Sequence, residues 1–102
     1  MTIAPLLLPF IRRAILDLLN DAGGEHNDEV LAMLLVQLGH RIARRDVREQ
    51  LRWLATAGGD DCQLVALETL DPYLVARIRP DGRDVADGRL LVDGIWKHKT
   101  GE

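Results

Sequence analysis

Hydrophobic residues in the first part of the chain recur with the three-to-four-residue spacing of an amphipathic helix. The spacing predicts a helix that begins near Pro5–Pro9 and ends at the glycines of "NDAGG", because proline is tolerated in a first turn and glycine commonly ends a helix. The polar residues Arg12, Arg13 and Asp17 are expected to point into solvent. The opposite, apolar face consists of Ile11, Ala14, Ile15, Leu18 and Leu19.

Two further helices are predicted downstream. Asn27 is a favourable N-cap residue for a second helix, which closes at Gly39. Its main apolar stripe consists of Val30, Leu31, Leu34, Leu35 and Leu38. A third helix is expected from Arg44 to about Ala57. Its inward face consists of Val47, Leu51 and Leu54.

The pattern changes in the second half of the chain. The segments "CQLVALETL" and "YLVARIRP" are apolar and partly alternating, and they flank "DP", which predicts a two-stranded hairpin of residues 62–70 and 73–79. A short helix is expected from Pro80 to Gly88. The fold class is therefore α+β, mainly α with a β-hairpin.

This order of elements is the layout of a winged helix-turn-helix, with three helices, a two-stranded wing and a short C-terminal helix. The span "GHRIA" has the right length to join the second and third helices. We expect an apolar N-terminal arm over residues 1–9, a winged-helix domain over 10–92 and a flexible basic tail over 93–102.

The distribution of charge adds a functional prediction. The 102-residue chain has a formal net charge of −3, yet residues 41–54 contain five arginines and two acids, a local charge of +3. Four of these arginines lie on the third helix and point away from its inward face. Arg45, Arg48 and Arg52 form one stripe, and Arg44 flanks it. Outward arginines on such a helix contact phosphates and guanine edges, which predicts double-stranded DNA as a partner. The alternative is a solvated face whose arginines pair with nearby acids.

The segments "RRDVREQLRWLATAG" and "LVARIRPDGRDVADGR", with the tail "LLVDGI", resemble small winged-helix proteins of the ArsR-like kind encoded by Mu-like phages and prophages. With the first two helices, the resemblance covers most of the chain. It implies a regulatory role, such as transcription regulation, or an architectural role, with DNA contact through Arg44, Arg45, Arg48 and Arg52. Arg41, in the preceding turn, is assigned to the same surface.

The sequence departs from this pattern in two places. Ala43 precedes the third helix where a serine or threonine cap is usual, so one backbone donor is left without a side-chain acceptor. The wing tip carries Glu68 and Asp71, whose negative charge would repel phosphate. Arg77 and Arg79 alternate on the second strand, and we include them in the predicted DNA-contact set.

Catalytic and metal-binding chemistry is not indicated. His26, His40 and His98 are far apart in sequence, and Cys62 is the single cysteine, so we expect no metal, no cofactor and no enzymatic activity. The composition is that of a soluble globular domain, and no apolar run reaches the roughly 18 residues of a membrane span. We therefore expect a cytoplasmic protein without a membrane partner.

Surplus apolar residues point to an interface between two copies of the chain. The N-terminal arm is apolar, and the second helix is apolar almost all round, which predicts a homodimer. The predicted interface consists of Leu6, Leu7, Leu8, Phe10, Met33 and Val36. The same surplus, together with the net acidity, supports an alternative function as a protein–protein interaction module on a winged-helix frame, with a phage or host protein as partner and no DNA binding.

Overall fold

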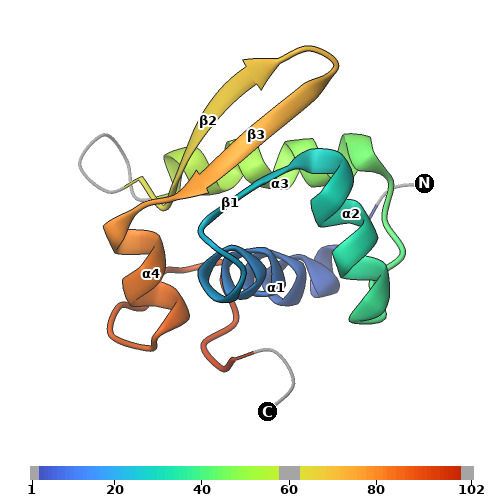
Figure 1. Cartoon of the computed structure of the whole chain (residues 1–102). Coiled ribbons are helices and arrows are strands. Elements are labelled where there is room, and N and C mark those ends of the chain that lie inside the picture. Colours follow the sequence, from blue (N-terminus) through green and yellow to red (C-terminus); the bar gives the residue numbers. More distant parts are fainter. Residues whose placement is uncertain (1–2, 58–62, 100–102) are drawn as a thin grey trace.

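The computed structural model describes residues 3–57 and 63–99 (Figure 1). These residues form an α+β fold with a three-stranded antiparallel sheet. The helices are a short 3₁₀ helix η1 (Pro5–Leu7), α1 (Leu8–Asp21), α2 (Asp28–Gln37), α3 (Arg44–Thr56) and α4 (Pro80–Ala86). The strands are β1 (Glu25–Asn27), β2 (Val65–Leu70) and β3 (Tyr73–Ile78). The predicted helices are thus confirmed, and the hairpin lies where expected, although the first residue of its predicted first strand, Cys62, falls outside the described residues.

The sheet contains one strand that the sequence pattern did not predict. Its order is β1-β3-β2, with Glu25 opposite Arg77 on β1 and β3, and Leu70 opposite Tyr73 across the hairpin turn. The segment of β1 is short and polar, so it lacks the apolar alternation by which a strand is recognised. Its extended conformation is instead stabilised by pairing with β3, and the prediction of two strands was incomplete.

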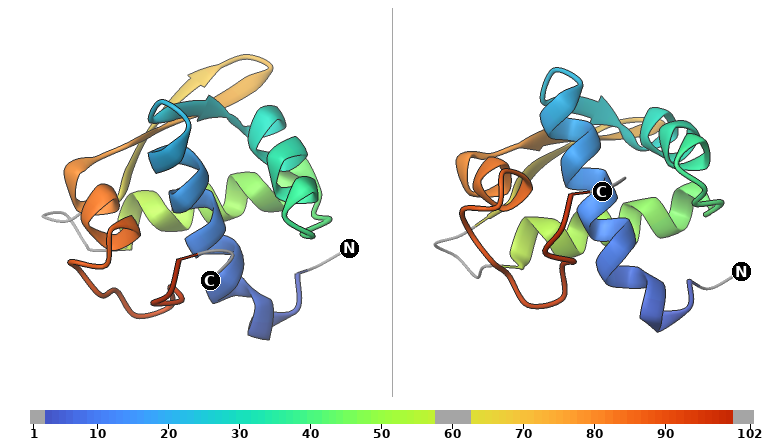
Figure 2. Two further views of the ribbon diagram at one scale, coloured as in Figure 1. Left: turned by 60° about the horizontal axis from the view of Figure 1, so that its bottom comes forward. Right: turned by 90° about the horizontal axis from the view of Figure 1, so that it is seen from below.

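Helix α1 lies at the centre of the fold. It runs beneath α3 and the sheet, while α2 and α4 flank it (Figures 1 and 2). The three residues predicted to form the inward face of α3 have no exposed surface, and neither do Leu16 and Leu19 of α1. The buried apolar core is continuous and consists of Ile11, Ala14, Ile15, Leu16, Leu19, Leu31, Leu35, Val47, Leu51, Leu54, Leu64, Val65, Leu74, Ala76, Ile78, Val85, Ala86 and Ile95.

The polar side of α1 is covered, contrary to expectation. Arg13 and Asp17 are buried and form an ion pair at 3.0 Å, and Arg13 Nη2 also donates to the carbonyl oxygen of Ala86 at 2.7 Å. The guanidinium of Arg12 lies 3.8 Å from the centre of the Trp53 ring. The prediction that these polar residues face solvent was wrong, because the helix periodicity marks one apolar face and does not show that α4 and the C-terminal residues cover the other.

The C-terminal segment packs along α1. The backbone N–H of Trp96 donates to the carbonyl oxygen of Pro9 at 3.1 Å, and its ring lies 4.8 Å from that of Phe10. Ile95 joins the core, and Gly94 adopts a φ of +90° where it packs against Trp53. We expected a flexible basic tail over residues 93–102. Residues 94–96 pack along α1, and Lys99 lies 3.6 Å from Asp21, whereas residues 100–102 lie outside the described residues.

Helix α2 begins as predicted but is only partly buried. The side chain of Asn27 accepts a hydrogen bond from the N–H of Val30 at 2.8 Å, which confirms the N-cap. Leu31 and Leu35 have no exposed surface, whereas Leu38, at the end of the predicted stripe, is exposed. The helix is covered on the side that faces α1 and α3, and the rest of its apolar surface remains open.

Gly82 should be essential to the packing of α4. A Cβ at this position would overlap the carbonyl oxygen of Leu64 and approach Ile78 Cγ1 to 2.9 Å. We expect Gly82→Ala to lower the free energy of unfolding by about 2 kcal/mol in urea denaturation, the cost of overpacking a buried site. Helix propensity alone predicts the opposite sign, a gain of roughly 0.5–1 kcal/mol, and that result would contradict the packing we describe.

Candidate nucleic-acid interface

The arginine stripe of α3 lies on the open side of the helix, beside the hairpin. Arg45 and Arg52 are exposed, while the side chains of Arg44 and Arg48 are 36% and 32% exposed. These four arginines line an open hollow of about 410 Å³, together with Glu49 and Pro72. The structure therefore brings together the four arginines that the resemblance had singled out.

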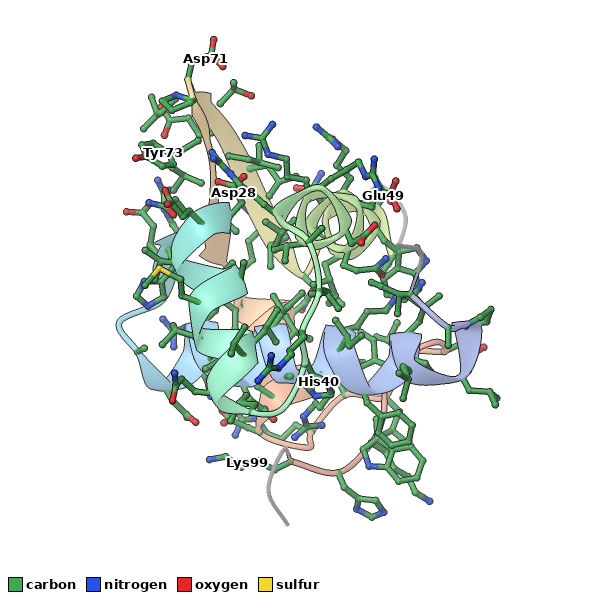
Figure 3. All side chains as sticks on the ribbon, turned by 90° about the vertical axis from the view of Figure 1, so that its right-hand side faces the viewer. Asp28, His40, Glu49, Asp71, Tyr73 and Lys99 are labelled. Carbon is green, nitrogen blue, oxygen red and sulfur yellow. The ribbon has the colours of Figure 1, made fainter. Side chains whose placement is uncertain are left out.

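Two of these arginines are bound by one buried carboxylate. Arg44 Nε and Arg48 Nε donate to Asp28 Oδ2 at 2.6 and 2.5 Å, and Asp28 has no exposed surface. Figure 3 shows Asp28 at the start of α2, enclosed between α3 and the hairpin. The two guanidinium groups are thus held side by side, one helical turn apart.

Asp28 also connects to the hairpin. Its second oxygen, Oδ1, accepts from the backbone N–H of Leu74 at 3.0 Å. Arg48 Nη2 donates to the carbonyl oxygen of Pro72 at 2.6 Å, and Arg44 Nη2 donates to the same oxygen. The guanidinium of Arg44 lies 5.2 Å from the centre of the Tyr73 ring. The tip of the hairpin is therefore tied to α3 through the same two arginines.

The hydrogen bonds to Asp28 change its acidity. Burial by itself raises the pKa of the carboxyl group, but hydrogen bonds from Arg44, Arg48 and the Leu74 N–H outweigh it and lower the pKa from 3.8 to about 2. The hydrogen bond between Arg44 and Asp28 also raises the pKa of Arg44. Asp28 is consequently ionised throughout the neutral range and neutralises part of the arginine charge.

The remaining polar side chains of the hollow are not engaged. Within residues 3–57 and 63–99, the side chains of Arg45, Glu49 and Arg52 form no hydrogen bond or ion pair. The predicted alternative was pairing of the arginines with nearby acids, and the acids of the same helix are Asp46 and Glu49. Neither of them pairs with an arginine in the described part of the chain. Asp46 is buried on the other side of α3, and its Oδ2 has no hydrogen-bond partner among the described residues. The four arginines carry a charge of +4, and the carboxylates of Asp28 and Glu49 carry −2, so the net charge at the hollow is +2.

Other residues of the predicted DNA-contact set lie outside the hollow. Arg77 Nε donates to Glu25 Oε1 on β1 at 3.2 Å, and Arg79 follows β3 at the beginning of α4, the end of the hairpin opposite its tip. Arg41 is exposed and lines a separate, more apolar hollow of about 490 Å³ with His40, Ile42 and residues of the N-terminal arm. The structure therefore does not bring these three arginines together with the stripe on α3.

Five residues of the predicted dimer interface are exposed, and the sixth, Leu8, is half-buried. Leu6 is the most open at 86%, followed by Met33 at 64%. Phe10 is partly covered by Trp96, so the C-terminal segment extends the apolar surface of the arm. The structure leaves this surface available to a second copy, and the dimer stays a prediction.

Sequence reasoning missed the part played by Asp28. The helix dipole alone is an adequate explanation for an acid in the first turn of a helix, so the position of Asp28 in the sequence indicates no further role. Arg44, Arg48 and Leu74 lie far from Asp28 in the sequence, so the sequence does not indicate that they contact it. Within the described ranges there is no group of acids, histidines or cysteines arranged to bind a metal ion, and no helix with the length and apolar character needed to cross a bilayer.

Asp28 should make the protein sensitive to acid. Because its folded-state pKa is below the ordinary value, Asp28 stabilises the fold above about pH 4 and ceases to do so as the pH falls toward 2. The difference of nearly two pKa units corresponds to about 2 kcal/mol. We expect Asp28→Asn to be less stable than wild type at pH 7 by at least about 2 kcal/mol, with the gap narrowing below pH 4.

Urea denaturation at a series of pH values measures this difference. Glu25→Gln is the matched control, because Glu25 is also paired with an arginine but is about half exposed, and such pairs contribute little. Parallel pH profiles for wild type and Asp28→Asn would contradict the role assigned to Asp28.

Comparison with known proteins gives a phage relative. The chain is 38% identical over 84 residues to gp26, an uncharacterized protein of Escherichia phage Mu, and the match covers 82% of each protein. No protein-family model matches the chain, and no solved structure matches it significantly. The expected relationship to proteins of Mu-like phages is confirmed by this identity over most of both sequences. The chain therefore belongs to the family of the phage Mu protein gp26.

Proposed function

We propose that this protein is a winged-helix protein that binds double-stranded DNA through α3, as a regulatory or architectural factor of a Mu-like phage or prophage acting in the cytoplasm. The order α1, β1, α2, α3, β2, β3 with a three-stranded antiparallel sheet is compatible with the ArsR-like layout that the sequence resembles. In that layout α3 enters the major groove and the hairpin is the wing.

The observation that carries the proposal is the grouping of Arg44, Arg45, Arg48 and Arg52 around one open hollow on α3. Arg44 and Arg48 are held in position by Asp28, and a prearranged guanidinium loses less conformational entropy when it binds a phosphate. Each uses two donor groups for Asp28 and Pro72, so further N–H groups remain for a ligand. The side chains of Arg45 and Arg52 form no hydrogen bond or ion pair with any described residue, so all their donor groups remain for a ligand.

The alternative, a protein-interaction module, is favoured by two observations. The hairpin tip exposes Glu68 and Asp71, which disfavour contact between the wing and a phosphate backbone. Leu6 and Met33 are exposed apolar residues that suit a protein surface. The following experiment separates the two functions, because only DNA binding requires the arginines of α3.

Binding of a fluorescently labelled random-sequence duplex, followed by anisotropy at several salt concentrations, tests the proposal. We expect wild type to bind with an affinity that falls steeply with salt. In Arg45→Ala/Arg52→Ala, affinity should fall about tenfold or more. The salt slope should become shallower by up to about two units, because on a random-sequence duplex each arginine removed takes away one cation that lies close to the phosphates.

Arg83→Ala/Arg89→Ala removes the same charge near α4 and serves as the matched control. Urea denaturation of each variant verifies that it is folded. If wild type fails to bind even at low salt, or if the control variant is weakened as much as the α3 variant, α3 is not a DNA surface. A folded wild-type protein that binds no duplex would favour the interaction module.

The proposal includes a homodimer formed through the arm and α2. Sedimentation velocity should show a dimer for wild type and a monomer for Leu6→Glu/Met33→Glu, because charge at exposed apolar positions disfavours burial in an interface. Leu91→Glu is the matched control, since Leu91 is 72% exposed but lies outside the predicted interface. A monomeric wild-type protein, or an equal effect of the control, would contradict this interface.

A further inference from the structure

Glu49 has an unexpected position on a phosphate-binding surface. It lines the hollow together with all four arginines, it is exposed, and Figure 3 shows it on the open side of α3. It forms no ion pair with any described residue, so it does not serve to orient a neighbouring arginine. A carboxylate at this place weakens attraction to phosphate, and a surface that only bound the DNA backbone would be better without it.

The four arginines of the hollow divide into two pairs. Arg44 and Arg48 are bound to Asp28 and to the Pro72 carbonyl oxygen, so they hold the hairpin against α3. Arg45 and Arg52 have no partner among the described residues. Glu49 follows Arg45 by four positions and precedes Arg52 by three, so these three unengaged side chains share one face of the helix.

We infer that Arg45, Glu49 and Arg52 are a base-reading row, in which Glu49 accepts a hydrogen bond from the amino group of a cytosine and the two arginines bind guanine edges. The inference rests on the proposed DNA-binding function and adds sequence specificity to it. It assigns to Glu49 the role of a specificity-determining residue.

The chemistry of the major groove supports this assignment. A carboxylate can only accept hydrogen bonds, and the cytosine N4 amino group is the donor it commonly binds, whereas arginine binds the O6 and N7 acceptors of guanine. The row rises about 10 Å along the helix axis from Arg45 to Arg52. This length corresponds to about three base pairs, so one helix can read a short G·C-rich element.

Selection from a randomised duplex library, followed by sequencing, tests the inference. We expect wild type to enrich a G·C-rich element with one position restricted to a C·G pair. Glu49→Ala should relax that position, reducing discrimination about tenfold, while its affinity for random duplex rises. Glu49→Gln should change the preference at that position toward adenine, whose N6 and N7 groups match a glutamine amide.

Asp93→Asn is the matched control, because it neutralises an exposed acid outside the hollow, and it should leave the selected element unchanged. If wild type binds duplex DNA but enriches no element, or if Glu49→Ala and Glu49→Gln retain the wild-type element, Glu49 does not read a base and the DNA-binding function still stands. If wild type binds no DNA, the proposed function itself fails, and this inference fails with it.

Discussion

One carboxylate joins the three parts of the fold that meet at the hollow. Asp28 begins α2, binds two arginines of α3 and accepts the N–H of Leu74 on β3, so both of its oxygens are engaged within the protein. The arginines then extend past it to the Pro72 carbonyl oxygen at the hairpin tip. The angle between hairpin and helix, and hence the shape of the hollow, depends on this single buried charge.

The same interaction limits how much positive charge α3 presents. Asp28 neutralises half of the charge of the pair that it holds, and Glu49 opposes the other two arginines. The resulting surface is moderately basic on a protein whose net charge is −3. The negative charge of the rest of the chain opposes the approach of a phosphate to this surface. DNA binding, as we propose it, therefore depends on the arrangement of donors and acceptors on α3 as well as on its charge.

Much of this arrangement could be predicted from the sequence, and the remainder could not for a definite reason. The apolar period of Val47, Leu51 and Leu54 determines which side of α3 is inward and therefore where its arginines point. No comparable period marks Asp28, because its partners are 16 to 46 residues away. Strand β1 and the buried Arg13 were missed for the same reason: each acquires its environment from distant segments. Local patterns describe faces of single elements, whereas the covering of those faces is decided by the tertiary fold.

The two tryptophans lie at different places in the molecule, and neither of them lines the hollow. Trp53 is held between the Arg12 guanidinium and Gly94, where α3, α1 and the C-terminal segment meet. Trp96 rests on Phe10 and contacts His98 at the edge of its ring. Indole emission depends on such surroundings, so the protein carries two built-in optical reporters. The fluorescence emission of Trp53 reports on the packing of α3 against α1, and that of Trp96 reports on the packing of the C-terminal segment against α1. Neither measurement needs an external label near the arginines.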